Sequence, residues 1–388
     1  MKKLIVSLCV VMIVLVSTVS FIGCSQEETP GTQVVTDMLG RDVTVPTNPQ
    51  RVVCIGAGAL RLYSYVGDMS KLCGVENVEK TDSTYGGNLA IRPYKEVNQE
   101  LFDSLQDCGK GGPQNQAAEP ESIIACNPDL VISLMDTDVA ATNALQEQIG
   151  VPVIRVLYDS ANIFSDVVSN SIKLLGKALN KEDRANDVVN YMNTLKADLV
   201  ERTSDIAESE KPSVYLGCHS SWGKGGFLSS SANYAIFNLL GVKNAITASD
   251  FVTKDNKTLT DLEKLVDIDP DKIIIDLGGL DLMKGEYALD DTAAIYNSLT
   301  ALKNGEVYTQ FPFNAYYTNI ETVYINAYYI GSVVYPDKFS DVNISEKADE
   351  IFVQFLHHTF YSEMVDEYGA LRKLNLAATF PKYDDGRS

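Results

Sequence analysis

One short pattern occurs twice in this chain, and it constrains the fold more than any other feature. Residues 121–134 read Glu-Ser-Ile-Ile-Ala-Cys-Asn-Pro-Asp-Leu-Val-Ile-Ser-Leu, and residues 263–276 read Glu-Lys-Leu-Val-Asp-Ile-Asp-Pro-Asp-Lys-Ile-Ile-Ile-Asp. The residue before a proline is disfavoured in helical conformation, so each copy predicts a short helix that ends at the proline. The apolar run that follows predicts a strand buried on both faces. The repeat indicates two similar α/β lobes, unless a common helix-to-strand connection occurs twice by chance.

The elements around the two copies recur in the same order, which argues against chance. A strand at 51–55, a loop with Gly56 and Gly58 and a helix ending at Gly67 precede the first copy. A strand at 213–216, the glycine-rich loop 219–226 and a helix at 234–240 precede the second. We therefore predict an α/β fold with two similar lobes in one chain.

Between the lobes, apolar residues recur at helical spacing from 161 to 206. This predicts that a single long α-helix joins the lobes, with a kink or restart near Asn180. The predicted domains are an N-terminal lobe at 34–160, the linker helix at 161–208 and a C-terminal lobe at 209–388. An antiparallel hairpin with its turn at Gly40 is expected at the start of the first lobe.

The amino terminus has the pattern of a secretory signal peptide, predicted at 1–23. Two lysines precede a short apolar run from Leu4 to Val16. Gly23-Cys24 resembles a bacterial lipobox, although Phe21 stands where leucine is usual, so Cys24 is the predicted lipidation site. Residues 24–33 would form a flexible tether, and the protein would be extracytoplasmic and lipid-anchored to the cell membrane. The alternative is ordinary secretion.

Charge and cysteine usage exclude several function classes. The net charge of −20 argues against binding to nucleic acid, which requires a basic face. Outside the signal peptide and Cys24, the spacing of the cysteines fits neither a disulfide framework nor a zinc site. These cysteines are Cys54, Cys73, Cys108, Cys126 and Cys218. Cys54 and Cys126 lie in apolar runs and are expected in the core.

Several segments resemble the ABC-transporter substrate-binding proteins for ferric siderophores, haem and cobalamin. They are residues 36–46 and 49–55, Gly58-Ala-Leu-Arg-Leu, Pro128-Asp-Leu-Val-Ile and Ala327-Tyr-Tyr-Ile-Gly. The resemblance implies an α/β fold of two Rossmann-like lobes joined by a single long α-helix, with a ligand cleft between the lobes. It implies a monomer that is not an enzyme and has no intrinsic cofactor. Its partners would be a metal chelate, an ABC permease and the permease's ATPase. It also implies that one glutamate per lobe contacts permease arginines. By position these are Glu121 and Glu263, with Glu119 as a rival in the first lobe.

Ligands of doubly wound lobes bind beyond the carboxyl ends of strands, and this rule selects the candidate contacts. The candidates are Gly58, Arg61, Tyr85, Arg92, Tyr94, Tyr158, His219, Trp222, Lys224, Tyr316, Tyr317, Asn319 and the segment from Leu277 to Gly279. Arg61, Arg92 and Lys224 would suit an anionic chelate, with surface ion pairs as the alternative.

The other side chains also have two readings. Trp222 would stack on a planar ligand or belong to the core. Tyr316 and Tyr317 would be phenolate ligands or, more simply, pack against the second lobe. His219 would bind metal or be an ordinary loop histidine.

Two other function classes stay open. One is a surface sensor or adhesin with the same fold. The other is a two-lobed enzyme, which the absence of a catalytic sequence motif disfavours. The sequence does not distinguish a ferric siderophore, haem, cobalamin, another chelate or bare metal as the ligand.

Overall fold

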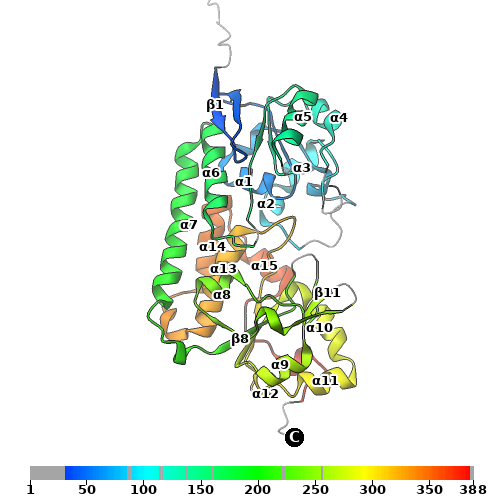
Figure 1. The fold of residues 1–388 in the computed structure, drawn as a ribbon, viewed down its shortest axis with the longest axis vertical. Helices are drawn as coiled ribbons and strands as arrows, with labels where there is room; N and C mark the ends of the chain where they lie inside the picture. Colours follow the sequence, from blue (N-terminus) through cyan, green and yellow to red (C-terminus); the bar gives the residue numbers. More distant parts are fainter. Residues whose placement is uncertain are drawn as a thin grey trace, which may run out of the picture. The chain divides into compact units, whose positions relative to one another are not determined.

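A computed structural model describes residues 31–84, 90–112, 115, 117–135, 138–159, 161–220, 223–254 and 257–384. The elements described below all belong to one compact unit, Thr32–Ser388. Within this unit two α/β lobes are present, and the helix α7 (Glu182–Thr203) runs from the first toward the second (Figure 1). Across the described ranges, no helix has both the length and the apolar character needed to span a membrane.

The N-terminal lobe is built on a five-stranded parallel sheet with the strand order β5-β4-β3-β6-β7. The strands are β3 (Val52–Ile55), β4 (Leu72–Val75), β5 (Gln106–Asp107), β6 (Leu130–Ser133) and β7 (Val153–Arg155). The helices are α1 (Ala59–Val66), α2 (Pro93–Glu96), α3 (Gln99–Ser104), α4 (Pro120–Ala125) and α5 (Val139–Ile149). Every residue of β3 and β6 is buried, as predicted for strands covered on both faces.

The C-terminal lobe has a four-stranded parallel sheet with the order β13-β12-β8-β9. Its strands are β8 (Ser213–Gly217), β9 (Lys243–Asn244), β12 (Lys272–Asp276) and β13 (Val307–Gln310), and β10 (Phe251–Lys254) and β11 (Lys257–Thr260) form a separate antiparallel hairpin. Its helices are α8 (Ala235–Leu239), α9 (Leu262–Ile268), α10 (Leu280–Tyr287), α11 (Asp290–Tyr296), α12 (Thr300–Lys303), α13 (Ile320–Val334), α14 (Ile344–Leu356), α15 (Tyr361–Tyr368) and α16 (Leu376–Thr379). The β10–β11 hairpin was not predicted from the sequence.

The repeated Pro-Asp pattern has the same structural role in both lobes. The strand after it, β6 or β12, pairs in parallel with the first strand of its sheet, β3 or β8. The Asp129 carboxylate accepts the backbone N–H groups of Gln50 and Arg51 at 2.7 and 3.0 Å. The Asp271 carboxylate accepts the N–H of Ser213 at 2.7 Å. Each aspartate therefore fixes the chain at the start of the neighbouring strand, which confirms that the repeat reflects two similar lobes.

The predicted hairpin is present as β1 (Thr32–Thr36) and β2 (Asp42–Pro46). Asp37 organises its turn by accepting the N–H groups of Leu39 and Arg41, and it forms a buried ion pair with the Arg41 guanidinium at 2.7 Å. The N–H of Arg155 also donates to the Asp37 carboxylate, at 3.1 Å. The hairpin is thereby attached to strand β7.

The helical segment between the lobes restarts where the sequence predicted. Helix α6 (Asp166–Ala178) ends just before Asn180, which has a positive φ of 54°, and α7 begins at Glu182. The two helices pack closely because a Cβ on Gly176 would lie only 2.4 Å from the Cβ of Ala185. Helix α7 has 22 residues and is therefore about 33 Å long, and it is the long helix of the connection.

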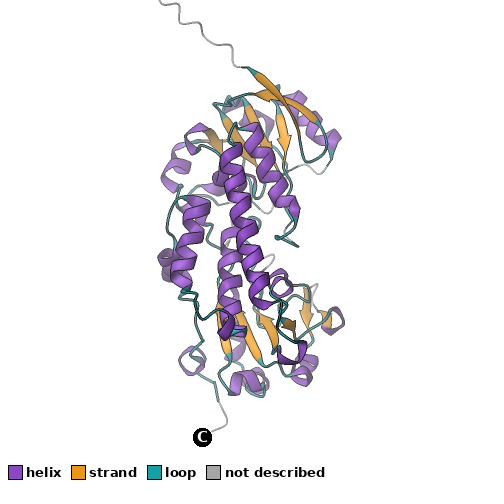
Figure 2. Cartoon of the chain, turned by 90° about the vertical axis from the view of Figure 1, so that its left-hand side faces the viewer, coloured by secondary structure: helices purple, strands orange, loops and turns teal. Residues whose placement is uncertain are grey.

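The helices α1, α7, α13 and α14 pack on one another between the two sheets (Figure 2). One apolar core runs through this region, because it includes Val52 and Leu130 of the first sheet and Val214 and Ile274 of the second. Cys54 and Cys126 are buried, as predicted, and the described cysteines are free thiols. The shared core holds the two strand-end regions in a fixed relation.

Candidate ligand-binding site

The two lobes meet at the segment Phe313–Asn319, which we call the bridging loop. It leaves β13 and leads into α13. Tyr316 and Tyr317 have positive φ angles of 51° and 68°, a backbone conformation that is unfavourable for large side chains. The N–H of Asn319 donates to the Phe313 carbonyl at 2.8 Å, so the loop is closed on itself. Two such residues in succession persist only where the surroundings determine them.

Arg61 of α1 holds much of the bridging loop in this backbone conformation. Its guanidinium donates to the carbonyls of Ala315 and Tyr316 at 2.7 and 3.1 Å, and to Oδ1 of Asn319 at 3.0 Å. The side chain is fully buried. Nδ2 of Asn319 in turn donates to the Ile91 carbonyl at 3.0 Å. Arg61 thus joins the N-terminal lobe to the bridging loop.

Two buried carboxyl groups, Glu76 and Glu79, bind side chains beside the bridging loop. Glu76 accepts the backbone N–H of Gly56 at 3.0 Å and the hydroxyl of Tyr316 at 2.8 Å. Burial raises the pKa of Glu76 to about 7. Glu79 forms a buried ion pair with Arg92 at 2.8 Å and accepts the hydroxyl of Tyr94 at 2.7 Å. Each of these donors therefore has a carboxylate partner inside the protein.

The bridging loop also presents an accessible aromatic surface. The rings of Tyr158 and Tyr317 are stacked, with centroids 5.3 Å apart and planes 11° apart. Gly58 lies beside both, since a Cβ there would be 3.1 Å from Tyr158 and 3.2 Å from Tyr317. Tyr317 is 36% exposed. A planar or apolar group of a ligand can therefore approach this stack.

The C-terminal lobe contributes a second polar cluster at the ends of β8 and β12. The Asp276 carboxylate accepts the N–H groups of Ser220 and Gly278 at 3.2 and 2.9 Å, and burial raises its pKa to about 7. Nδ1 of His219 lies 4.0 Å from this carboxylate and has no hydrogen-bond partner among the described residues. Burial lowers the pKa of His219 to about 4, so the imidazole is neutral at physiological pH. The Ser220 carbonyl accepts from Asn314, which connects the cluster to the bridging loop.

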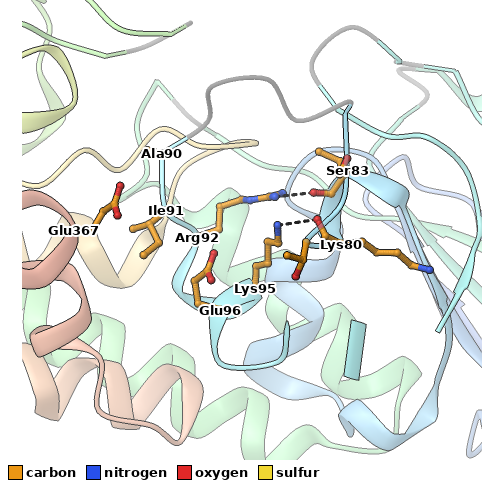
Figure 3. A pocket seen from close by; sticks show the side chains of 10 residues that line it. Lys80, Ser83, Ala90, Ile91, Arg92, Lys95, Glu96 and Glu367 are labelled. Atoms are coloured by element: carbon orange, nitrogen blue, oxygen red, sulfur yellow. Dashed lines mark hydrogen bonds between the residues drawn. The ribbon is translucent and has the colours of Figure 1, made fainter. Parts of the chain in front are cut away.

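An open pocket of about 350 Å³ lies beside the bridging loop (Figure 3). Its lining comes from residues 78–83 and 90–96 of the N-terminal lobe and from Glu367 of α15. The cations on its wall are Lys80, Arg92 and Lys95. Among the described residues, no group of three or more histidine, cysteine and acidic side chains is arranged to hold a metal ion.

The structure brings together most of the residues that the strand-end rule selected. Gathered at the bridging loop are Gly58, Arg61, Arg92, Tyr94, Tyr158, Tyr316, Tyr317 and Asn319. Leu277 to Gly279 follow β12, beside His219 in the second cluster, and Lys224 is exposed. Tyr85 and Trp222 lie outside the described residues.

Two features of the site differ from the expectation. Arg61 and Arg92 are not free cations, because a salt bridge or carbonyl groups occupy both guanidinium groups. The buried acids Glu76, Glu79 and Asp276 were missed. The signal for two of them was present in the sequence, since Glu76 directly follows a strand and Asp276 ends one.

The two glutamates expected at the permease are in equivalent positions. Glu121 and Glu263 are both exposed and lie in the first turns of α4 and α9. The rival Glu119 instead accepts the backbone N–H of Lys110 at 3.0 Å. Helices α4 and α9 lie at the far ends of the two lobes (Figure 1). Docking of the permease at these two glutamates stays a prediction.

Comparison with known proteins agrees with this architecture. The chain is 26% identical over 184 residues to YvrC of Bacillus subtilis, an ABC transporter substrate-binding lipoprotein, in a match that covers 47% of this chain and 51% of that protein. It is 19% identical over 350 residues to the molybdate-binding protein MolA of Haemophilus influenzae, covering 84% and 92%. A periplasmic solute binding protein from Veillonella parvula superposes with a TM-score of 0.62 at 22% identity, covering 91% of this chain and all of that one.

The sequence profile of one family spans both sheets. The match covers residues 52–310, from the first strand of the N-terminal sheet to the last strand of the C-terminal sheet. It confirms the resemblance seen in the sequence. The chain belongs to the periplasmic binding protein family.

Proposed function

We propose that this protein is the extracytoplasmic substrate-binding lipoprotein of an ABC importer. It captures an iron chelate or another metal chelate, such as a ferric siderophore, haem or cobalamin, between its lobes. It then delivers the ligand to a permease driven by an ATPase. Family membership supports the transport role. The observation that carries the proposed ligand position is the Tyr158–Tyr317 stack at the junction of the lobes, in which Tyr317 is exposed.

In this proposal the residues at the junction have two kinds of role. Tyr317, Gly58 and Tyr158 form the surface on which the ligand lies, with Trp222 and Lys224 contributing from the C-terminal lobe. Arg61 and Arg92 act as positioning residues, because their guanidinium groups hold the bridging loop and its acids. His219, as a neutral buried imidazole, is available as a contact from the opposite lobe.

Molybdate is a second candidate ligand. The observation that favours it is the match to the molybdate-binding protein MolA, which extends over 92% of that protein. An oxyanion is much smaller than a siderophore and needs hydrogen-bond donors rather than an aromatic surface. The size and the metal content of the bound ligand therefore distinguish the two candidates.

Native mass spectrometry of protein purified from its own cells, combined with elemental analysis, tests the proposal. We expect one metal-containing ligand per chain, with iron or cobalt for the chelates and molybdenum for the oxyanion. A protein that carries no such ligand and binds none of ferric siderophores, haem, cobalamin and molybdate contradicts the proposal. Turnover of a substrate would instead support the enzyme alternative, and retention of ligand without any uptake would support a sensor.

A further inference from the structure

The pocket beside the bridging loop contains a lysine that forms no ion pair within the described ranges. Lys80 donates to the Leu105 carbonyl at 2.5 Å and pairs with Asp107 at 2.5 Å, and Arg92 pairs with Glu79 at 2.8 Å. Lys95 Nζ, by contrast, donates to the Lys80 carbonyl at 3.2 Å and has no carboxylate within 4.0 Å in the described part of the chain. Of the three cations, Lys95 is therefore the one without a direct ion-pair partner among the described side chains.

Lys95 is also held in a position that is unfavourable for its charge. Its side chain is half-buried and extends between Arg92 and the backbone of Lys80, while the Lys80 side chain points away (Figure 3). Burial is the largest effect on the pKa of Lys95 and lowers it, and the neighbouring guanidinium of Arg92 lowers it further. The carboxylates of Glu79, Glu96 and Asp103 act in the opposite direction, but the net shift is downward. An anion that enters the pocket would offset this shift, since it places an opposite charge in direct contact with Nζ.

The rim of the pocket limits how much negative charge such a ligand can carry. Glu96 of α2 and Glu367 of α15 both line it, and both are exposed. Neither forms an ion pair with a described residue. A carboxylate can reach Lys95 between them, whereas a group with several negative charges would meet repulsion at the opening.

The size and chemistry of the lining match a small polar group. The volume of about 350 Å³ is at the lower end of the range for small-molecule sites. The hydroxyl-bearing residues Thr81 and Ser83 line the pocket together with the charged groups. One carboxylate arm of a larger molecule fits such a space, with the rest of that molecule extending toward the bridging loop.

We infer that this pocket binds a carboxylate-bearing arm of the transported ligand, with Lys95 as the counter-ion and Glu96 and Glu367 selecting for a single negative charge. This inference rests on the proposed transport function and makes it more specific, because it identifies the ligand as a chelate with a peripheral carboxylate. The residues involved lie outside the set that the strand-end rule selected, except for Arg92.

The first experiment uses acetate alone, a carboxylate with one negative charge, so that its result does not depend on the metal ligand. In the wild-type protein, an excess of acetate should shift the ammonium resonance of Lys95 in a lysine-labelled NMR spectrum and raise its pKa toward the ordinary value. Lys243→Met removes an exposed lysine in β9 and should leave this response unchanged. An unmoved Lys95 resonance overturns the inference, even if the protein later proves to carry a chelate.

The second experiment measures selectivity by isothermal titration calorimetry with two ferric trihydroxamates, one neutral and one that carries a single peripheral carboxylate. Lys95→Met should weaken binding of the carboxylated chelate roughly tenfold or more, the effect of losing one charged hydrogen bond, and leave the neutral chelate within about twofold. Glu96→Gln with Glu367→Gln should strengthen binding of the carboxylated chelate roughly two- to fivefold. Equal losses for both chelates in Lys95→Met, or no loss for either, refute the pocket assignment. Absence of any bound metal ligand in native protein refutes the transport proposal instead.

Discussion

The buried acid Glu76 makes the stability of this protein depend on pH in a direction that can be calculated. Its pKa in the folded protein is about 7, against an ordinary value of 4.5, and burial is the main cause. The folded protein therefore binds a proton more readily than the unfolded chain, so stability falls as pH rises from about 4.5 to 7. At about 1.4 kcal/mol per pH unit, the contribution of Glu76 is roughly 3 kcal/mol.

Glu76→Gln removes this contribution because the amide does not ionise. The free energy of unfolding of the variant, relative to wild type, should rise by roughly 3 kcal/mol between pH 4 and pH 8. The assay is urea unfolding followed by circular dichroism at a series of pH values. Taking the difference between the two proteins cancels groups that they share, including Asp276, whose pKa is also raised to about 7.

Tyr316→Phe is the matched variant, because it removes the hydroxyl that stabilises the charged form of Glu76. At alkaline pH, where Glu76 is charged, the free energy of unfolding of this variant should be lower than that of wild type by roughly 1.5–3 kcal/mol, the contribution of one hydrogen bond to a charged group. In the double variant with Glu76→Gln this pH dependence should disappear. If the Glu76→Gln difference has the same value at pH 5 and pH 8, Glu76 is not a buried acid at the bridging loop and the reasoning is refuted.

Three further predictions concern the anchor, the docking surface and the linker. Cys24→Ala should release the protein from the membrane fraction, and an unacylated, soluble wild type would contradict the lipoprotein proposal. Glu121→Arg with Glu263→Arg should abolish uptake while ligand affinity stays constant. Stability should change by no more than about 0.3–1 kcal/mol per site, the usual effect of a charge near a helix start, and wild-type uptake by this double variant would rule out docking through these residues. Gly176→Ala should destabilise the protein by about 1–3 kcal/mol, because its Cβ would lie 2.4 Å from Ala185. The control Gly285→Ala meets no atom within 4 Å and should be neutral or stabilising by up to about 1 kcal/mol.

The repeated Pro-Asp pattern predicted the fold correctly because its physical basis is local. A proline ends each short helix, and the short apolar run that follows is rich in β-branched residues, which favours a buried strand. Asp129 and Asp271 then hold the adjacent strands in the same way. The restart near Asn180 was likewise visible, since a polar stretch interrupted the helical spacing.

The chemistry of the site was less predictable, because it depends on contacts between distant parts of the chain. Arg61 is a structural residue only because the carbonyls of Ala315 and Tyr316, from the other lobe, lie beside it. Lys95 stands out only because Lys80 and Arg92 have carboxylate partners, whereas Lys95 has no ion-pair partner among the described residues. No periodicity or motif encodes such pairings, whereas the strand-end rule did identify the region in which they occur.

Hydrogen exchange measured with and without the native ligand tests most directly whether the ligand is held between the lobes. We predict slower exchange in segments of both lobes, namely residues 56–61, the bridging loop 313–319 and the strand-end segment 217–220. Helices α4 and α9 should be unaffected, since they are the proposed docking surface. Protection confined to one lobe, or protection that spares the bridging loop, would contradict capture between the lobes.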